Sequence, residues 1–127
     1  MKVLTIVMKV LLILVLITPI LGASGVFPAP TADLYSPSGW AFMEALMNSG
    51  YMFPLLALTA AVVIVLLIMN RTALAAIILA PYTVNVLCFH LFVDGTFFHP
   101  AASLGWVLIL GNAYFLWLNR KKYKALW

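Results

Sequence analysis

The chain has little charge and almost no cysteine. Only 8% of its 127 residues are Asp, Glu, Lys or Arg, and 66% are hydrophobic. Soluble domains carry roughly 25% charged residues. So little polar surface cannot cover a domain in water, and the composition therefore predicts a protein whose solvent is the lipid bilayer. The single cysteine, Cys88, excludes an internal disulfide, a Cys-x-x-Cys redox pair and a metal cluster of thiolates from this chain alone.

Four long apolar segments are present instead, at residues 3–22, 51–69, 72–93 and 101–118. About 20 helical residues, at 1.5 Å each, cross the roughly 30 Å of hydrocarbon in a bilayer. None of the segments alternates with period two, which argues against a transmembrane β-barrel. We therefore predict an all-α fold: one polytopic transmembrane domain over residues 1–127, built as an antiparallel bundle of four transmembrane helices.

Small residues spaced four apart are candidates for the closest helix contacts, because apolar burial does not drive helices together in lipid. Ala57 and Ala61 have this spacing in the second segment, Ala76 and Ala80 have it in the third, and Ala101 and Gly105 have it in the fourth. The short turn at Asn70-Arg71 makes the second and third segments antiparallel neighbours. Contacts between segments that are distant in the sequence are not determined by the pattern.

Basic residues fall on one side of the predicted membrane and acidic residues on the other. This distribution predicts that both chain ends are inside. It also accounts for the net charge of +4 without a nucleic-acid partner, since no basic stripe is interleaved with stacking aromatics. The inner residues are Lys2, Lys9, Arg71, Arg120, Lys121, Lys122 and Lys124, and the outer ones are Asp33, Glu44 and Asp94.

Residues 23–50 form the longest segment outside the predicted spans. Its three prolines, the last of which is Pro37, favour extended or turn backbone over its first half. Residues 40–47 are predicted to form a short helix with Trp40 and Met43 on one face. Such a helix would lie in the membrane interface and cover the bundle from outside.

The first apolar segment has a second interpretation. Lys2 and Lys9, the apolar run that follows and the small residues Ala23-Ser24-Gly25 are also typical of a cleaved signal peptide. Cleavage would remove about residues 1–25 and leave three spans with incomplete packing. We therefore expect the segment to be retained.

Polar side chains inside a span are candidates for function. Tyr82 and Asn85 share one face of the third span, and Asn112 lies in the middle of the fourth. In one interpretation the two asparagines form hydrogen bonds across helices and hold the bundle together. In the other, Tyr82, Asn85 and Asn112 line a pocket for a polar headgroup, such as a quinone carbonyl.

His90 and Asp94 are four residues apart on one face at the outer end of the third span, and His99 follows in the outer loop. A carboxylate can hold an imidazole in one tautomer, which suits proton exchange near neutral pH. The alternative is an interface histidine that pins the loop 94–100. No recognised spacing supports a metal site from the three residues. At 100° per residue His90 lies about 140° from Asn85, so we expect two separate sites.

Several short stretches resemble the DoxX-like family of small integral membrane proteins. The resemblance covers about residues 20–127 and is most specific around Asn85, His90 and Asp94. It rests on Ser49-Gly50-Tyr51, Phe53-Pro54-Leu55-Leu56, Leu79-Ala80-Pro81, Phe89-His90-Leu91-Phe92-Val93-Asp94 and Tyr114-Phe115-Leu116-Trp117.

The resemblance implies a four-helix protein of the bacterial cytoplasmic membrane. Some relatives are associated with thiosulfate:quinone oxidoreductases or with membrane complexes that handle oxidative stress. One departure is Ala60, because relatives often carry a glutamate directly after the threonine of the second span. If that carboxylate serves proton or quinone chemistry, the chemistry is absent here.

The function predicted first is a non-catalytic membrane subunit, or a binder of an apolar molecule or partner protein. It would have no intrinsic cofactor, and no catalytic residue is assigned because no nucleophile–base pair is evident. The alternative is a subunit of a quinone-linked redox complex with proton exchange near His90 and Asp94. A third alternative is a small transporter, against which the lack of inverted repeats argues. Expected partners are the lipid bilayer and an oxidoreductase subunit or a second copy of the chain.

Overall fold

The computed structural model describes residues 1–95, 98–99 and 102–126, and over these residues the protein is all-helical with no strand. The 3₁₀ helices η1 (Ala32–Leu34) and η4 (Lys122–Leu126) are short, and the π-helix η2 (Phe89–Asp94) continues α4. The α-helices are α1 (Lys2–Ala23), α2 (Pro37–Asn48), α3 (Met52–Ile68), α4 (Thr72–Cys88) and α5 (Ser103–Leu118).

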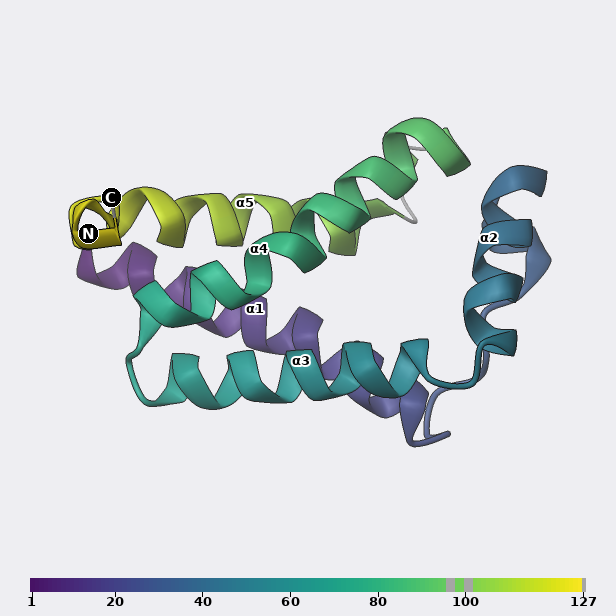
Figure 1. The fold of residues 1–127 in the computed structure, drawn as a ribbon, viewed down its shortest axis with the longest axis horizontal. Helices are drawn as coiled ribbons and strands as arrows, with labels where there is room; N and C mark the ends of the chain where they lie inside the picture. Colours follow the sequence, from purple (N-terminus) through teal and green to yellow (C-terminus); the bar gives the residue numbers. More distant parts are fainter. Residues whose placement is uncertain (96–97, 100–101, 127) are drawn as a thin grey trace.

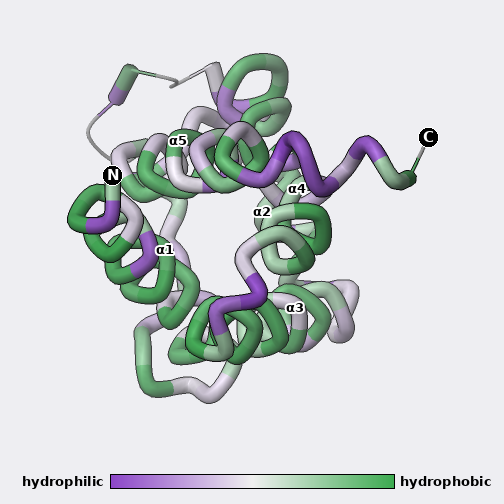
Figure 2. The backbone as a smooth tube through the Cα atoms, turned by 90° about the vertical axis from the view of Figure 1, so that its left-hand side faces the viewer, coloured by the Kyte–Doolittle hydropathy of each residue, from purple (hydrophilic) through white to green (hydrophobic). Residues whose placement is uncertain are grey.

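The four longest helices pack side by side around one core (Figure 1). α1 and α4 each contact both α3 and α5, so the order around the bundle is α1, α3, α4, α5 (Figure 2). Figure 2 also shows hydrophobic residues along all four helices and hydrophilic ones in the C-terminal tail. The core is formed by Leu12, Leu16, Ala60, Val63, Leu67, Ala75, Ala76, Leu79, Leu108 and Phe115.

Two helical segments are long and apolar enough to cross a membrane, Lys2–Ala23 and Thr72–Asp94. α2 and α3 meet the same criterion as a pair but are bent by 86° from each other, and α5 is apolar but shorter. The sequence therefore placed helices correctly at each of the four apolar segments. The start of the fourth predicted span, at residue 101, lies outside the described residues.

At Gly111, α5 packs directly against Leu12 of α1. A Cβ atom placed on this glycine would lie 2.6 Å from Leu12 Cδ2 and 2.7 Å from Leu12 Cγ, so no larger residue fits without movement. On α3, Ala60 is fully buried, whereas Ala57 and Ala61 are only partly buried. Small residues thus permit the tight contacts, as expected in lipid. The four-residue spacing identified Ala76, which is buried in the core, and Gly105, which lies against Val86 and His90, but not Ala60 or Gly111.

Two Asn–Thr hydrogen bonds join α4 and α5. Asn112 Nδ2 donates to Thr83 Oγ1 at 3.1 Å, and both residues are buried. Asn119 Nδ2 donates to Thr72 Oγ1 at 3.1 Å. The interpretation of Asn112 as a residue that bonds across helices is therefore confirmed.

Charge separates along the bundle axis. Both chain ends and the turn between α3 and α4 lie at one end of the molecule, and α2 lies at the other (Figure 1). Lys9 Nζ donates to Asn70 Oδ1 and so ties α1 to that turn. All seven Lys and Arg residues belong to α1, to the turn between α3 and α4 or to the C-terminal tail. The three acidic residues belong to segments at the α2 end.

α2 begins three residues earlier than the sequence predicted. Ser36 caps it, because Ser36 Oγ accepts a hydrogen bond from Gly39 N at 3.1 Å, and Pro37 occupies the first turn. The expectation that Pro37 resists helix was wrong because a first-turn proline needs no N–H partner and has a suitable φ. Gly50, at φ +74°, then turns the chain from α2 into α3 in a conformation that favours glycine.

Candidate functional site

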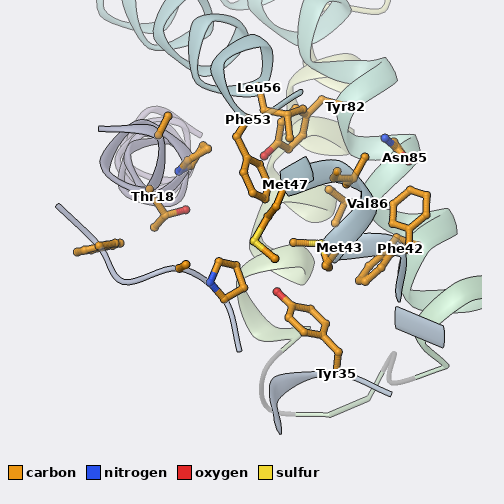
Figure 3. Close-up of a pocket in the computed structure, with 18 of the residues that line it drawn as sticks. Thr18, Tyr35, Phe42, Met43, Met47, Phe53, Leu56, Tyr82, Asn85 and Val86 are labelled. Atoms are coloured by element: carbon orange, nitrogen blue, oxygen red, sulfur yellow. The ribbon is translucent and has the colours of Figure 1, made fainter. Parts of the chain in front are cut away.

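A cavity of about 490 Å³ lies between the bundle and α2 (Figure 3). Its walls come from α1, the loop after it, α2, α3, α4 and η2. α2 contributes the face that carries Phe42, Met43, Leu46 and Met47, so the apolar side of this helix faces the cavity. The other apolar lining residues are Pro19, Gly22, Ala23, Phe27, Pro28, Ala29, Pro30, Phe53, Leu56, Val86 and Phe89.

Five polar residues interrupt this apolar lining: Thr18, Tyr35, Tyr82, Asn85 and His90. The hydroxyl oxygens of Thr18, Tyr35 and Tyr82 come from three different elements and point into the cavity (Figure 3). Thr18 Oγ1 donates to Val15 O at 2.7 Å. The hydroxyls of Tyr35 and Tyr82 form no hydrogen bond with any of the described residues. None of the described lining residues is Lys, Arg, Asp or Glu.

A second cavity of about 390 Å³ adjoins the first and extends toward α5, where Leu104, Gly105 and Leu108 line it. Asp94 also lines this second cavity but not the first. The two cavities share a wall made of Thr18, Tyr35, Tyr82, Val86, Phe89 and His90. Polar groups are therefore concentrated where the cavities meet.

His90 lies in that shared wall, between Asp94 and α5. Its Nδ1 is 3.9 Å from Asp94 Oδ2, which is too far for a hydrogen bond. Nδ1 is buried and has no hydrogen-bond partner among the described residues. On the other side of the ring, a Cβ placed on Gly105 would lie 3.3 Å from Nε2, so the glycine makes room for the imidazole.

Asp94 fastens α2 to the end of η2. Its side chain is only 1% exposed, and Oδ1 accepts a hydrogen bond from Ser36 N at 2.7 Å. Ser38 Oγ donates to the neighbouring carbonyl of Val93. The carboxylate thus lies at the N-terminus of α2, where the helix dipole favours negative charge. The alternative that an interface histidine pins the loop 94–100 stays a prediction, because part of that loop lies outside the described residues.

Comparison with known proteins assigns this chain to no family. No protein-family model, curated protein or solved structure matches the chain.

The structure brings some of the predicted site residues together. Tyr82 and Asn85 line the first cavity, but Asn112 lines neither cavity and its amide faces Thr83. His99 is exposed and lines neither cavity. Among the described residues, no group of three or more His, Cys, Asp and Glu side chains is placed to hold a metal ion.

The expectation of two separate sites was wrong, since His90 and Asn85 line the same cavity. The 140° separation assumed an α-helix throughout the third span. The π-helix that begins at Phe89 reduces this angle only over the last two residues, and the cavity reaches both side chains because Val86 and Phe89 between them line it as well. Periodicity of apolar residues gives no sign of this change, because the segment is apolar on nearly every side.

Tyr35 is a site residue that the sequence did not single out. Its ring stacks on Trp40 with centroids 6.4 Å apart and meets Phe89 edge-on at 6.0 Å. Burial, and secondarily the nearby Asp94 charge, raise the pKa of Tyr35 above its usual value. The phenol therefore remains a neutral hydrogen-bond donor at physiological pH. Its position depends on how the outer segment folds back, which no local motif indicates.

Proposed function

We propose that this chain is a DoxX-like integral membrane protein that crosses a bacterial cytoplasmic membrane four times. α1 and α4 with η2 have the length and composition of spans. α3 and α5, of 17 and 16 residues, pack between them on both sides. Backbone polar groups in the bilayer core must be hydrogen-bonded within the protein, and a helix satisfies this requirement by itself. Four helices that cross the bilayer side by side therefore fit it best.

The outward faces of the helices support contact with lipid. Large apolar side chains on them are exposed, and a continuous exposed apolar belt is unstable in water. In a bilayer the same side chains are solvated by acyl chains. The exposed residues include Val3, Ile6, Val10 and Leu14 on α1, Leu55, Leu58 and Val65 on α3, Leu74, Ile77 and Val84 on α4, and Leu104 and Leu110 on α5.

Charge supports an orientation with both chain ends inside, since Lys and Arg concentrate on cytoplasmic sides. The basic tail is anchored at this end. Arg120 lies over the Trp117 ring at 4.4 Å, and Tyr123 OH donates to Ala73 O at 3.0 Å.

Cysteine labelling in intact cells tests the topology, starting from a Cys88→Ser background. Glu44 is exposed at the α2 end, and Lys121 is exposed in the basic tail. We expect a membrane-impermeant maleimide to label Glu44→Cys in intact cells and Lys121→Cys only after permeabilisation. Labelling of Lys121→Cys in intact cells would show that the orientation is wrong.

The function that the geometry supports best is binding of an apolar molecule in the cavity under α2, without chemistry carried out by this chain alone. The observation that supports this function is the cavity itself. Its volume of about 490 Å³ falls in the range of roughly 300–1,000 Å³ found for ligand pockets. Its mainly apolar lining with a few convergent polar groups is typical of such pockets. A partner subunit or a second copy would then use or supply the bound molecule.

Filling the cavity should weaken binding. Gly22 lines it, and a Cβ atom on Gly22 would meet nothing within 4 Å. We expect Gly22→Trp to weaken binding of a dodecane with a terminal trifluoromethyl group at least about tenfold, a loss of about 1.4 kcal/mol. Fluorine NMR in maltoside micelles measures the bound fraction. Gly22→Ala is the matched control and should bind as the parent does; equal binding by all three proteins would contradict the proposal.

A quinone-linked redox subunit is the second candidate. It is favoured by His90, whose imidazole lies in the wall common to both cavities. It is weakened by Asp94, whose buried carboxylate is engaged with Ser36 N and lies too far from His90 to form a hydrogen bond. Ala60, fully buried where relatives often carry glutamate, also leaves that position without an acid. Binding without proton exchange therefore accounts better for the site.

A further inference from the structure

We infer that the cavity selects an uncharged molecule that carries a hydrogen-bond acceptor, of the ketone or ester type, on an apolar body. The inference rests on the proposed function, because it specifies the ligand of the same cavity. It is carried by three features of the lining: its unpaired donors, its lack of charge and its adaptable apolar walls.

The donors are the two phenols. Tyr35 OH and Tyr82 OH point into the cavity from different elements, and neither has a hydrogen-bond partner among the described residues (Figure 3). A polar group that is removed from water without a partner is unfavourable, so each phenol favours a ligand that offers an acceptor. Both residues line both cavities, which places the donors where the two spaces meet.

Charge on the ligand is disfavoured by the same lining. No described lining residue of the first cavity is Lys, Arg, Asp or Glu. An anionic headgroup would therefore lose its hydration without gaining a counter-ion. It would also approach Asp94, which lines the adjoining cavity. A cation would gain little from Asp94, because that side chain is 1% exposed and already accepts from Ser36 N.

The apolar walls do not favour one shape. Met43 and Met47 from α2 line the cavity together with Phe53 and Leu56 from α3. Methionine is unbranched and fills irregular space, so these walls adapt to different apolar bodies. The two phenols therefore select the ligand, through the polar headgroup that they bind.

Three probes of similar length separate these contributions: decyl methyl ketone, dodecane and dodecanoate. Each is titrated against the full chain in dodecyl maltoside, which has no carbonyl group. We expect the ketone to bind most tightly and dodecanoate most weakly. The infrared stretch of an isotope-labelled ketone carbonyl should move to lower frequency on binding, because the carbonyl accepts a hydrogen bond.

Tyr82→Phe and Tyr35→Phe each remove one donor and keep the ring. Each should weaken ketone binding about 2- to 12-fold and reduce the infrared shift, while dodecane binding stays unchanged. Tyr51→Phe is the matched control, because Tyr51 is 63% exposed and lines neither cavity. If one phenylalanine variant fails to fold, the other still tests the inference.

The outcomes distinguish the inference from the proposed function. Ketone and dodecane binding with equal affinity and no infrared shift would overturn the inference and leave apolar binding in place. Tightest binding of dodecanoate would overturn the requirement for an uncharged ligand. Failure of all three probes to bind would overturn the proposed function and the inference together.

Discussion

Replacing Gly111 with valine is expected to destabilise the protein by about 2–3 kcal/mol, the upper part of the range for overpacked sites. The added Cβ would lie 2.6 Å from Leu12 Cδ2 and 3.2 Å from Leu12 Cδ1, so either the Leu12 side chain or the two helices must shift. The higher helix propensity of valine stabilises the variant only slightly relative to glycine. The steric overlap with Leu12 therefore determines the change in stability. The free energy of unfolding in mixed detergent micelles measures the effect.

Two further variants test the cause. Gly22→Val makes the same substitution in a helix at a position with no atom within 4 Å, and its effect should stay within about 0.5 kcal/mol. Leu12→Ala alone should cost about 2–5 kcal/mol, because Leu12 is 1% exposed in the core. It also removes the atoms that a side chain at position 111 meets. The double variant should therefore lose clearly less than the sum, and an additive result would contradict the contact between Leu12 and Gly111.

Replacing Asp94 with alanine is expected to release α2 and to cost about 1.5–3 kcal/mol, the range for a hydrogen bond to a charged group. The substitution leaves Ser36 N without its acceptor and opens a space beside Gly39. A side chain on Gly39 would overlap the carboxylate, so helix and carboxylate are in direct contact. Hydrogen exchange of the amides of α2 measures the release directly.

Two carboxylate variants serve as controls for that result. Asp94→Asn keeps a side-chain oxygen that can accept from Ser36 N, so α2 should exchange only slightly faster than in the parent. Asp33→Ala removes an exposed carboxylate at the same end and should leave exchange unchanged. Equal exchange of α2 in Asp94→Ala and Asp33→Ala would mean that Asp94 does not hold the helix.

The helices themselves could be predicted from the sequence, since each long apolar run became a helix. Their arrangement could not, because a run that is apolar on every side does not indicate which face is buried. Gly111 illustrates the difficulty. It lies in an apolar run without a small partner four residues away, yet a side chain at this position would overlap Leu12 of α1. Ala60 was noted only as a departure from relatives, although it is fully buried.

The candidate site was predictable in part. Tyr82 and Asn85 could be identified because polar residues in a span are conspicuous, and both line the cavity. Thr18 and Tyr35 could not, because they join the site only through the packing of α1 and the return of the outer segment. The change from α-helix to π-helix at Phe89 could not be predicted either. Backbone geometry of this kind depends on tertiary contacts rather than on local composition.

The unequal lengths of the helices have a consequence for the surrounding lipid. At 1.5 Å per residue the 22 residues of α1 extend about 33 Å, whereas the 17 of α3 and the 16 of α5 extend about 26 and 24 Å. With η2 the span of α4 has 23 residues, so long and short helices alternate around the bundle. The bend at Gly50 prevents α2 from lengthening α3. In the proposed topology the hydrophobic belt is therefore narrower on two opposite sides, where the bilayer must thin or the helices must tilt. Membrane thickness would then affect the stability of this protein mainly through α3 and α5.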